Sequence, residues 1–217
     1  MCVSLAYYAE KEGVCRHSAH FFVNLRIKYT EKGMKNSHPL EKFQYCPACG
    51  SPHFRVHDDR SKRCAQCGFH FYLNASASTA AVILNSRREM LVVRRAKEPA
   101  RGTLDLPGGF CDFRETAEEG IMREVREETG LSVRPVRFLF SLPNIYPFGG
   151  MDIHTTDLFF LCQVEERGEA HGMDDASEAF WMPLDQVKPA DFGLHSISRG
   201  VEKLLRDRLA MGIDGCQ

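Results

Sequence analysis

Short apolar runs separated by polar turns dominate residues 78–184 and predict β-strands. The runs STAAVIL (78–84) and MLVVRRA (90–96) flank the polar segment NSRRE and therefore predict a β-hairpin. A short strand, LDLPGGF, is broken by one proline and two glycines. Further strands are expected at VRPVRFLFSL (133–142), TTDLFFLCQV (155–164) and EAFWMPL (178–184).

Two segments carry the helical spacing of apolar positions instead. The first begins near Thr116, which with Glu119 fits the capping box S/T-x-x-E, and ends near Gly130, a residue suited to the C′ position. The second covers residues 194–211, and its apolar side consists of Ile197, Val201, Leu204, Leu205 and Leu209. Strands combined with a central and a terminal helix predict an α/β or α+β sandwich.

The composition and the sequence pattern divide the chain into four parts. Residues 1–33 join no periodic pattern. We expect residues 1–43 to form an N-terminal tail in which Met34 is an alternative start, so that residues 1–33 would be a loose tail or an extension that is not native. An ordinary N-terminal strand or helix is the competing interpretation. Residues 44–73 are rich in cysteine, residues 75–210 hold the predicted strands and helices, and residues 211–217 form a C-terminal tail.

The chain length and the net charge limit the classes of protein to which this sequence can belong. The 217 residues suffice for one catalytic domain and a small module. A formal net charge of −1 argues against a strongly basic nucleic-acid binder, so nucleic acid is not an expected partner. No apolar run approaches the roughly 18 residues that span a bilayer, and the first residues lack the pattern of a signal peptide. We therefore expect a cytoplasmic protein without membrane contact.

Four of the nine cysteines form two C-x-x-C pairs with fourteen residues between them, the spacing of a zinc ribbon. Four thiolates complete a tetrahedral Zn²⁺ site without an open position, so the metal would be structural and would supply folding energy. Disulfides or free structural cysteines are the alternatives, which a reducing cytosol disfavours. The predicted ligands are Cys46, Cys49, Cys64 and Cys67. The nearby basic residues could contact phosphates, although a solvated loop is the commoner role; they are Arg55, Arg60, Lys62 and Arg63.

Residues 109–131 contain six glutamates and three arginines. On a helix, Glu124, Glu127 and Glu128 are at i, i+3 and i+4 and converge on one side. Like charges at this spacing repel by roughly 0.2–0.5 kcal/mol unless a cation neutralises them, and Mg²⁺ or Mn²⁺ prefers such carboxylate oxygens. The competing interpretation is an exposed helix face crossed by ion pairs of Arg123, which needs no metal.

The full spacing resembles the Nudix box, G-x5-E-x7-R-E-U-x-E-E-x-G-U, in which U is aliphatic. Gly109, Glu115 and the run REVREETGL at residues 123–131 occupy every fixed position. The resemblance implies a Nudix fold over residues 75–210, a mixed sheet sandwiched between helices. It also implies a hydrolase that uses Mg²⁺ or Mn²⁺ to cleave the pyrophosphate of a nucleoside diphosphate derivative by attack of water on phosphorus.

The resemblance also assigns roles by position in the box. The ligands of the catalytic metals would be Glu124, Glu127 and Glu128, one of which also serves as base. Arg123 would orient these glutamates by ion pairing, and Glu115 would be a structural or outer member of the site. Neutralising the phosphate oxygens while aiming a water at phosphorus is the chemistry that such cations supply.

Other candidate residues lie outside the helix. The loop at Gly108 and Gly109 would bring a backbone oxygen toward the cation, and both glycines would line the substrate site. The segment SEAFWMPL resembles the part of the family in which an acidic residue precedes a strand with a tryptophan. Asp175, Glu178 and the neighbouring Asp174 are candidates for a further metal ligand or base, and exposed loop acids are the alternative interpretation.

A four-cysteine ribbon directly before a Nudix domain resembles the NADH pyrophosphatase-like subfamily. That subfamily carries the motif S-Q-P-W-P-F-P-x-S beyond the box; here the segment SLPNIYPF agrees at Ser141 and Pro143 but lacks the Trp-Pro-Phe-Pro part. Flat rings bind well to aromatic faces, so Phe110, Tyr146 and Phe148 are candidate stacking partners for the substrate, with ordinary packing as the alternative.

The expected substrate is therefore a nucleotide, NAD(H) or an ADP-ribose-like compound. Two other functions stay open. A non-catalytic nucleotide sensor would be expected to lose box glutamates, and a protein that acts on an RNA cap would use the basic segment of the ribbon and bind RNA with a steep salt dependence. The resemblance also favours a homodimer, because related enzymes are often dimers.

Overall fold

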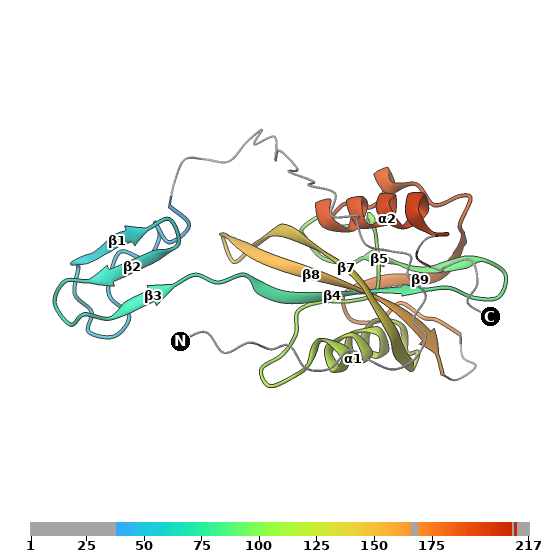
Figure 1. Ribbon diagram of the computed structural model, residues 1–217, viewed down its shortest axis with the longest axis horizontal. Helices are drawn as coiled ribbons and strands as arrows, with labels where there is room; N and C mark the ends of the chain where they lie inside the picture. Colours follow the sequence, from blue (N-terminus) through green and yellow to red (C-terminus); the bar gives the residue numbers. More distant parts are fainter. Residues whose placement is uncertain (1–37, 166–168, 210, 212–217) are drawn as a thin grey trace, which may run out of the picture. The chain divides into compact units, whose positions relative to one another are not determined.

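A computed structural model of the chain describes residues 38–165, 169–209 and 211 (Figure 1). The predicted tail at residues 1–33, the alternative start at Met34 and most of the predicted C-terminal tail lie outside the described residues. Within the described part of the chain, no helix is both long and apolar enough to cross a membrane.

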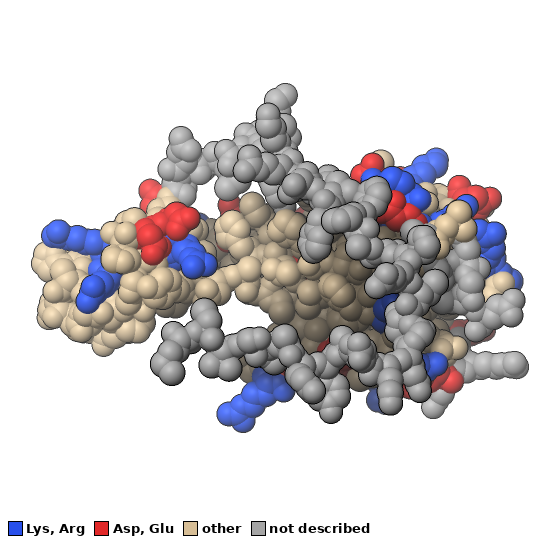
Figure 2. All heavy atoms as spheres, in the orientation of Figure 1, with Lys and Arg blue, Asp and Glu red and all other residues tan. Residues whose placement is uncertain are grey.

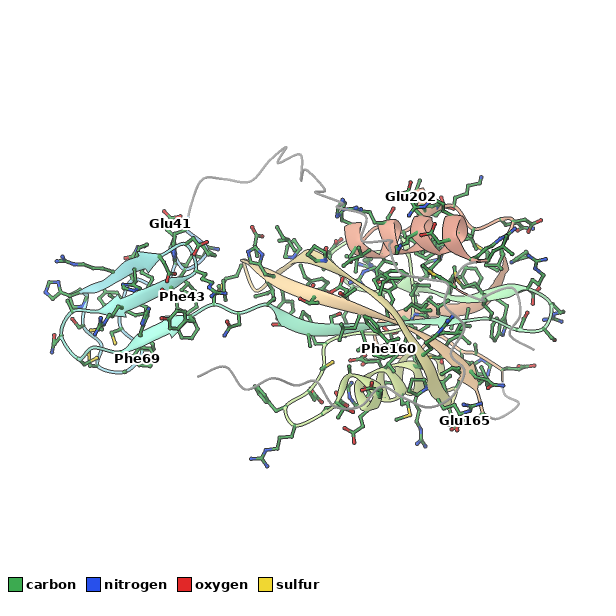
Figure 3. The ribbon with its side chains drawn as sticks, in the orientation of Figure 1. Glu41, Phe43, Phe69, Phe160, Glu165 and Glu202 are labelled. Atoms are coloured by element: carbon green, nitrogen blue, oxygen red, sulfur yellow. The ribbon has the colours of Figure 1, made fainter. Side chains whose placement is uncertain are left out.

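The cysteine-rich segment folds as a small three-stranded antiparallel sheet in the order β1-β2-β3. Its strands are β1 (Phe54–Asp58), β2 (Ser61–Cys64) and β3 (His70–Tyr72). One side of the sheet covers a small core in which Phe54 packs with Cys46 and Cys64, and Phe69 lies against it (Figure 3). So few apolar side chains cannot stabilise a domain of this size, which is why such modules depend on a metal.

The described residues from 76 onward contain two three-stranded sheets and two α-helices (Figure 1). The mixed sheet has the order β4-β8-β7, with β4 and β8 parallel, and the antiparallel sheet has the order β6-β5-β9. The elements are β4 (Ser76–Ile83), β5 (Glu89–Arg95), β6 (Leu104–Asp105), α1 (Ala117–Thr129), β7 (Val133–Phe148), β8 (Met151–Val164), β9 (Ala176–Pro183), the short 3₁₀ helix η1 (Pro189–Asp191) and α2 (His195–Asp207). The predicted mixed sheet between helices is confirmed.

Side chains alternate between two cores along the central strands, as the two-residue period of a strand requires. Val82 of β4 and Phe159 of β8 pack in the core on the side of α2, whereas their neighbours Ile83 and Phe160 pack on the side of α1 (Figure 3). The helices complete these cores with Ile197, Val201 and Leu204 from α2 and with Ile121 and Val125 from α1. Each helix therefore covers one face of the strands.

The terminal helix α2 is shorter than its apolar pattern predicts. It ends at Asp207, and Leu209, which the pattern places on the apolar side, is 81% exposed. The helix approaches β8 closely at Gly200, where a Cβ atom would lie 2.4 Å from the buried ring of Phe159. A glycine here sets the distance between helix and sheet.

The predicted hairpin at residues 78–96 is wrong. β4 and β5 follow each other along the chain, but β4 pairs with β8 and β5 pairs with β6 and β9. A single bridge between Leu84 and Met90 joins the two strands next to their turn. Both strands are apolar on both faces, and such a pattern does not tell an adjacent partner from a distant one.

The predicted strands at 133–142 and 155–164 extend into one long hairpin. β7 and β8 pair as far as Phe148 and Met151 and meet at Gly149 and Gly150, whose φ angles are 58° and 74°. The two prolines of SLPNIYPF did not interrupt β7, because β7 is an edge strand of its sheet and an edge strand tolerates missing donors. Tyr146 and Phe148 consequently lie on a strand.

Candidate functional site

The position of α1 is fixed by caps at both of its ends. The Thr116 hydroxyl accepts a hydrogen bond from the Glu119 N–H at 3.2 Å, and the Glu119 carboxylate accepts one from the Thr116 N–H at 2.8 Å. Gly130 ends the helix in the left-handed conformation with φ of 72°. The predicted capping box and C-terminal glycine are thus confirmed, and Glu119 is engaged in capping.

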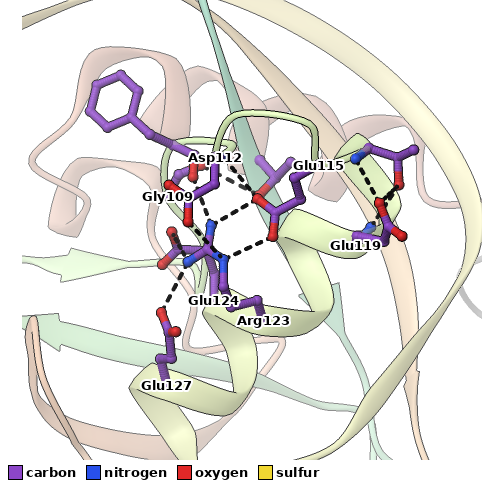
Figure 4. Close-up of polar contacts among 10 residues, drawn as sticks. Gly109, Asp112, Glu115, Glu119, Arg123, Glu124 and Glu127 are labelled. Atoms are coloured by element: carbon purple, nitrogen blue, oxygen red, sulfur yellow. Dashed lines mark hydrogen bonds and ion pairs between the residues drawn. The ribbon is translucent and has the colours of Figure 1, made fainter.

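The guanidinium group of Arg123 collects the acidic side chains of the box (Figure 4). It donates two parallel hydrogen bonds to Glu115, at 2.9 and 3.0 Å. One nitrogen atom donates to Glu124 at 2.9 Å and to Glu127 at 3.0 Å, and another donates to the Phe110 carbonyl at 3.0 Å. The helix and the loop before it are therefore held together by one charged group.

The three glutamates of the predicted metal site differ in environment. Glu128 is 8% exposed, and burial raises its pKa to about 8, although its carboxylate accepts a hydrogen bond from the Gly108 N–H at 3.0 Å. Burial also raises the pKa of Glu124, against the opposite effect of Arg123. The Glu127 side chain is 48% exposed. The acids of the site thus range from Glu128, which is buried, to Glu127, which is partly exposed to solvent.

Both glycines of the loop before the helix are required by close contacts. A Cβ atom at Gly108, whose φ is 150°, would lie 2.1 Å from the Thr79 carbonyl oxygen. At Gly109 it would lie 2.6 Å from the Glu124 carboxylate. The Gly109 carbonyl accepts a hydrogen bond from the Thr79 N–H at 2.8 Å. The loop consequently lies directly against β4 and against the helix acids.

The chemistry of these donors fits a divalent cation. The desolvated carboxylates of Glu124 and Glu128 lie next to Glu127, and hard cations such as Mg²⁺ and Mn²⁺ prefer carboxylate oxygens. Since burial penalises the charged forms of two of them, a cation would stabilise the ionised site. In the described structure the oxygens of the three residues are not all within 4.8 Å of one another. Arg123 binds Glu124 and Glu127 instead.

The four predicted zinc ligands come together, all with sulfur atoms within 4.8 Å of one another. The sulfur atoms of Cys46 and Cys67 are 3.7 Å apart, and so are those of Cys49 and Cys64. A tetrahedron with Zn–S bonds of about 2.3 Å has edges of about 3.8 Å, so the cluster has the size that zinc requires. The Ser51 N–H favours the Cys49 thiolate, but the neighbouring thiols raise its pKa to about 12, which a cation at the centre would reverse.

The three aromatic residues proposed as stacking partners form a contiguous group. The rings of Phe110 and Tyr146 meet edge to face with centroids 5.6 Å apart, and the rings of Tyr146 and Phe148 are 6.4 Å apart. Phe110 is 39% exposed and Phe148 is 67% exposed. Since Phe110 directly follows the glycine loop, the group lies beside the box.

A charged pair beneath these aromatic residues was missed from the sequence. Arg95 forms an ion pair with Asp105 at 2.7 Å, and both side chains are largely buried. The same guanidinium donates to the Tyr146 hydroxyl at 3.1 Å and to the Pro99 carbonyl at 2.7 Å. Burial raises the pKa of Asp105, while Arg95 opposes that shift. Two signals in the sequence could have indicated this pair. They are the consecutive arginines Arg94 and Arg95 at the end of one predicted strand and Asp105 within another apolar strand.

The two acids proposed as extra ligands are engaged in ion pairs. Glu178 pairs with Arg94 at 2.9 Å, and Asp175 pairs with Lys97. All four side chains are substantially exposed. Neither acid belongs to the Arg123 network, and their role in metal binding stays a prediction.

Two families of known domains match the chain. Residues 75–201 match the NUDIX domain, and residues 41–72 match the NADH pyrophosphatase zinc ribbon domain. The first match covers the glycine loop, α1 and the aromatic group, and the second covers all four cysteines.

Similar proteins of known name include NAD-capped RNA hydrolase NudC from Haemophilus influenzae, which is 26% identical over 73% of this chain and 58% of its own length. NAD-capped RNA hydrolase NudC from Deinococcus radiodurans is 34% identical over 66% of this chain and 50% of its own length. ADP-ribose pyrophosphatase from Methanocaldococcus jannaschii is 32% identical over 57% of this chain and 71% of its own length. The chain thus spans only 50% to 58% of these two NudC relatives.

Among solved structures, a NUDIX hydrolase from Nitrosomonas europaea aligns with a TM-score of 0.60 and 19% sequence identity, covering 77% of this chain and 93% of that one. At this identity the likeness supports the fold alone.

We predict that the purified chain contains one zinc ion, held by the four cysteines. Replacing Cys64 with serine should abolish zinc binding, because a tetrahedral site that loses one of its four thiolates binds the metal poorly. Cys111→Ser, outside the cluster, is the control and should keep the zinc. Elemental analysis of the three proteins measures this, and equal zinc content in the Cys64→Ser variant would contradict the assignment.

We further predict that Arg95→Met lowers the free energy of unfolding by about 3–5 kcal/mol, because it leaves the Asp105 carboxylate buried without its cation. The neighbouring Arg94→Met removes an exposed ion pair with Glu178 and should cost at most about 1 kcal/mol. Urea unfolding of both variants provides the comparison. Equal losses would show that the Arg95–Asp105 pair is not a buried ion pair in solution.

Proposed function

Because the chain belongs to the Nudix domain family, we propose that it is a metal-dependent hydrolase of the pyrophosphate linkage in nucleoside diphosphate derivatives. The observation that carries the proposal is the complete acidic face of α1. Its three glutamates are held by Arg123 and by the Gly108 N–H against the glycine loop. The sensor function is less well supported, since none of the box glutamates is replaced.

In this proposal each residue of the box has one task. Glu124, Glu127 and Glu128 would hold the cation, which when bound neutralises phosphate oxygens and activates water. Arg123 is a positioning residue, because its hydrogen bonds go to the carboxylates and to the Phe110 carbonyl. Glu115 fixes the orientation of Arg123 through a bidentate pair. Glu128 is the buried member of the three, with 8% of its surface exposed.

We propose NAD(H) or an ADP-ribose-like compound as substrate. Phe110, Tyr146 and Phe148 offer aromatic faces and edges beside the box, and flat bases bind to such groups. The names of the relatives support two kinds of substrate, ADP-ribose and NAD-capped RNA. Both carry a pyrophosphate, so one catalytic site can serve either. NAD-capped RNA is thus our second candidate, and it revises the sequence-based expectation that nucleic acid is not a partner.

The proposal includes two kinds of metal ion, Mg²⁺ or Mn²⁺ as the catalytic cation and Zn²⁺ as a structural ion in the ribbon. It also includes a cytoplasmic location and a homodimer. Asp175 and Glu178 are proposed as additional acids that become available if their exposed ion pairs with Lys97 and Arg94 open. Light scattering tests the homodimer directly.

The function is tested with a panel of NADH, NAD, ADP-ribose and NAD-capped RNA in the presence of Mg²⁺ or Mn²⁺. We expect release of AMP from at least one ADP-linked substrate, and loss of kcat on the order of 100-fold in Glu127→Gln, because a charged ligand of the cation is lost. Glu118→Gln, an exposed acid in the first turn of the same helix, is the control and should keep wild-type activity. Equal kcat for Glu127→Gln and the control would contradict the proposal.

The aromatic group gives a second prediction. Phe110→Ala should raise KM for NADH by about 3- to 10-fold with little change in kcat, since a stacking contact of about 0.5–1.5 kcal/mol is lost. The backbone carbonyl that binds Arg123 remains in this variant. Phe113→Ala removes a ring that is 102% exposed and should leave both constants unchanged. A wild-type KM in Phe110→Ala would exclude stacking on this ring.

A further inference from the structure

We propose that one face of the small cysteine-module sheet binds the single-stranded body of an RNA substrate. This face, called here the arginine face, consists of Arg55, His57, Arg63, His70 and Tyr72. The inference rests on the proposed function, in which NAD-capped RNA is a candidate substrate. It adds a second binding surface outside the Nudix box.

The strand register places these residues on one side of the sheet. Arg55 of β1 is directly opposite Arg63 of β2, which is directly opposite His70 of β3. Tyr72 is two residues after His70 and therefore points to the same side. His57 lies at an irregularity of β1 between Val56 and Asp58, where the register shifts. Such bulges re-aim side chains.

The rings of the arginine face form a continuous row. The ring centroids of His57 and His70 are 4.6 Å apart at an interplanar angle of 82°, and those of His70 and Tyr72 are 4.1 Å apart at 37°. Ser61 holds the row in place, because its hydroxyl is 3.0 Å from the His70 ring nitrogen. Tyr72 is nonetheless 45% exposed, so one end of the row is open for a base to stack on it.

The two arginines are arranged at an electrostatic cost. Like charges directly opposite each other on antiparallel strands destabilise the pair. Among the described residues, neither Arg55 nor Arg63 forms an ion pair within 4.0 Å, and both are exposed. The nearby Asp58 carboxylate accepts a hydrogen bond from the Arg60 N–H instead. A phosphate group between the arginines would remove the repulsion and gain charge-assisted hydrogen bonds.

The other basic residues of the segment are placed differently. Lys62 points to the opposite side of the sheet, where it is buried and donates to the Phe43 carbonyl at 2.5 Å. Arg60 lies in the turn between β1 and β2. The sequence-based interpretation as a solvated loop is therefore wrong for Lys62, which is buried on a strand. For Arg55 and Arg63 it is right about solvent exposure and wrong about the loop, because both lie on strands. Figure 2 shows separate basic patches on this module.

A groove of about 330 Å³ lies between the two arginines and His57, the first ring of the row. Its lining consists of Arg55, His57 and Arg63 together with Val56 and the residues Cys64, Ala65 and Gly68 of the second cysteine pair. Positive charge along a groove next to stacking rings is the combination that binds single-stranded nucleic acid without sequence preference. A duplex would use the arginines but would leave the rings without bases to stack on.

The test compares RNA with free nucleotide in the full-length protein. The variant Arg55→Gln/Arg63→Gln should bind an unmodified single-stranded RNA of about 15 nucleotides on the order of tenfold more weakly, because two phosphate contacts are lost. A plot of log affinity against log salt concentration should become shallower. The magnitude of its negative slope should decrease by about 1.4, because each of the two lost phosphate contacts on a single strand contributes about 0.7. Fluorescence anisotropy measures both effects without turnover.

The control variant Arg60→Gln/Arg87→Gln removes two exposed charges outside the groove and should bind RNA as the wild type does. For the arginine-face variant, kcat/KM on NAD-capped RNA should fall to the same extent as the affinity, and kcat/KM on free NADH should stay within about twofold. Zinc content equal to that of the wild type confirms that the module remains folded in each variant.

The stacking part is tested by Tyr72→Ala, which should weaken single-stranded RNA binding about tenfold, and by Tyr72→Phe, which should not. Two results would overturn the inference. One is an equal affinity for single-stranded RNA in the arginine-face variant and its control variant. The other is that Tyr72→Ala weakens binding of duplex RNA as much as it weakens binding of single-stranded RNA. Failure of the proposed function has a different signature, namely no hydrolysis of NADH or ADP-ribose by a wild-type protein that still binds RNA.

Discussion

The guanidinium of Arg123 is the group on which the candidate site depends. Without it, the carboxylates of Glu115, Glu124 and Glu127 would lie close together on the helix and on the loop before it, and they would repel one another. Arg123 makes five hydrogen bonds to these acids and to the Phe110 carbonyl. Arg123 and a cation bound by these glutamates would therefore share one task, which is to make an acidic surface stable. Arg123 performs it from one side, and a divalent cation would perform it from the other.

The same arrangement explains the two loop glycines, Gly108 and Gly109, and the buried acid Glu128. The glycine loop must pass against β4 and the Glu124 carboxylate, and any side chain there would separate them. Glu128 is anchored by the Gly108 N–H in a position where burial disfavours its charge. A carboxyl group whose pKa is raised this far by burial is typical of a functional site. The two cores on either side of the strands supply the rigid support that this loop and helix need.

The sequence allowed prediction of features that depend on spacing along one element. The caps of α1, the acidic face and the cysteine cluster all follow from short-range patterns, and the structure brings the four sulfur atoms to the separation that zinc requires. Features that depend on distant partners were missed. The pairing of β4 with β8 replaced the expected hairpin, and the Arg95–Asp105 pair joins strands that no periodicity connects.

Direct titration of Mn²⁺ tests, without any substrate, whether the acidic face of α1 binds a divalent cation. Electron paramagnetic resonance distinguishes free from bound Mn²⁺, so the bound fraction can be followed in the wild type and in Glu128→Gln. The wild type should bind Mn²⁺ saturably, and the variant should lose much of this affinity, because a buried carboxylate ligand is removed. Identical Mn²⁺ binding curves for the two proteins would contradict a cation site on this face of α1.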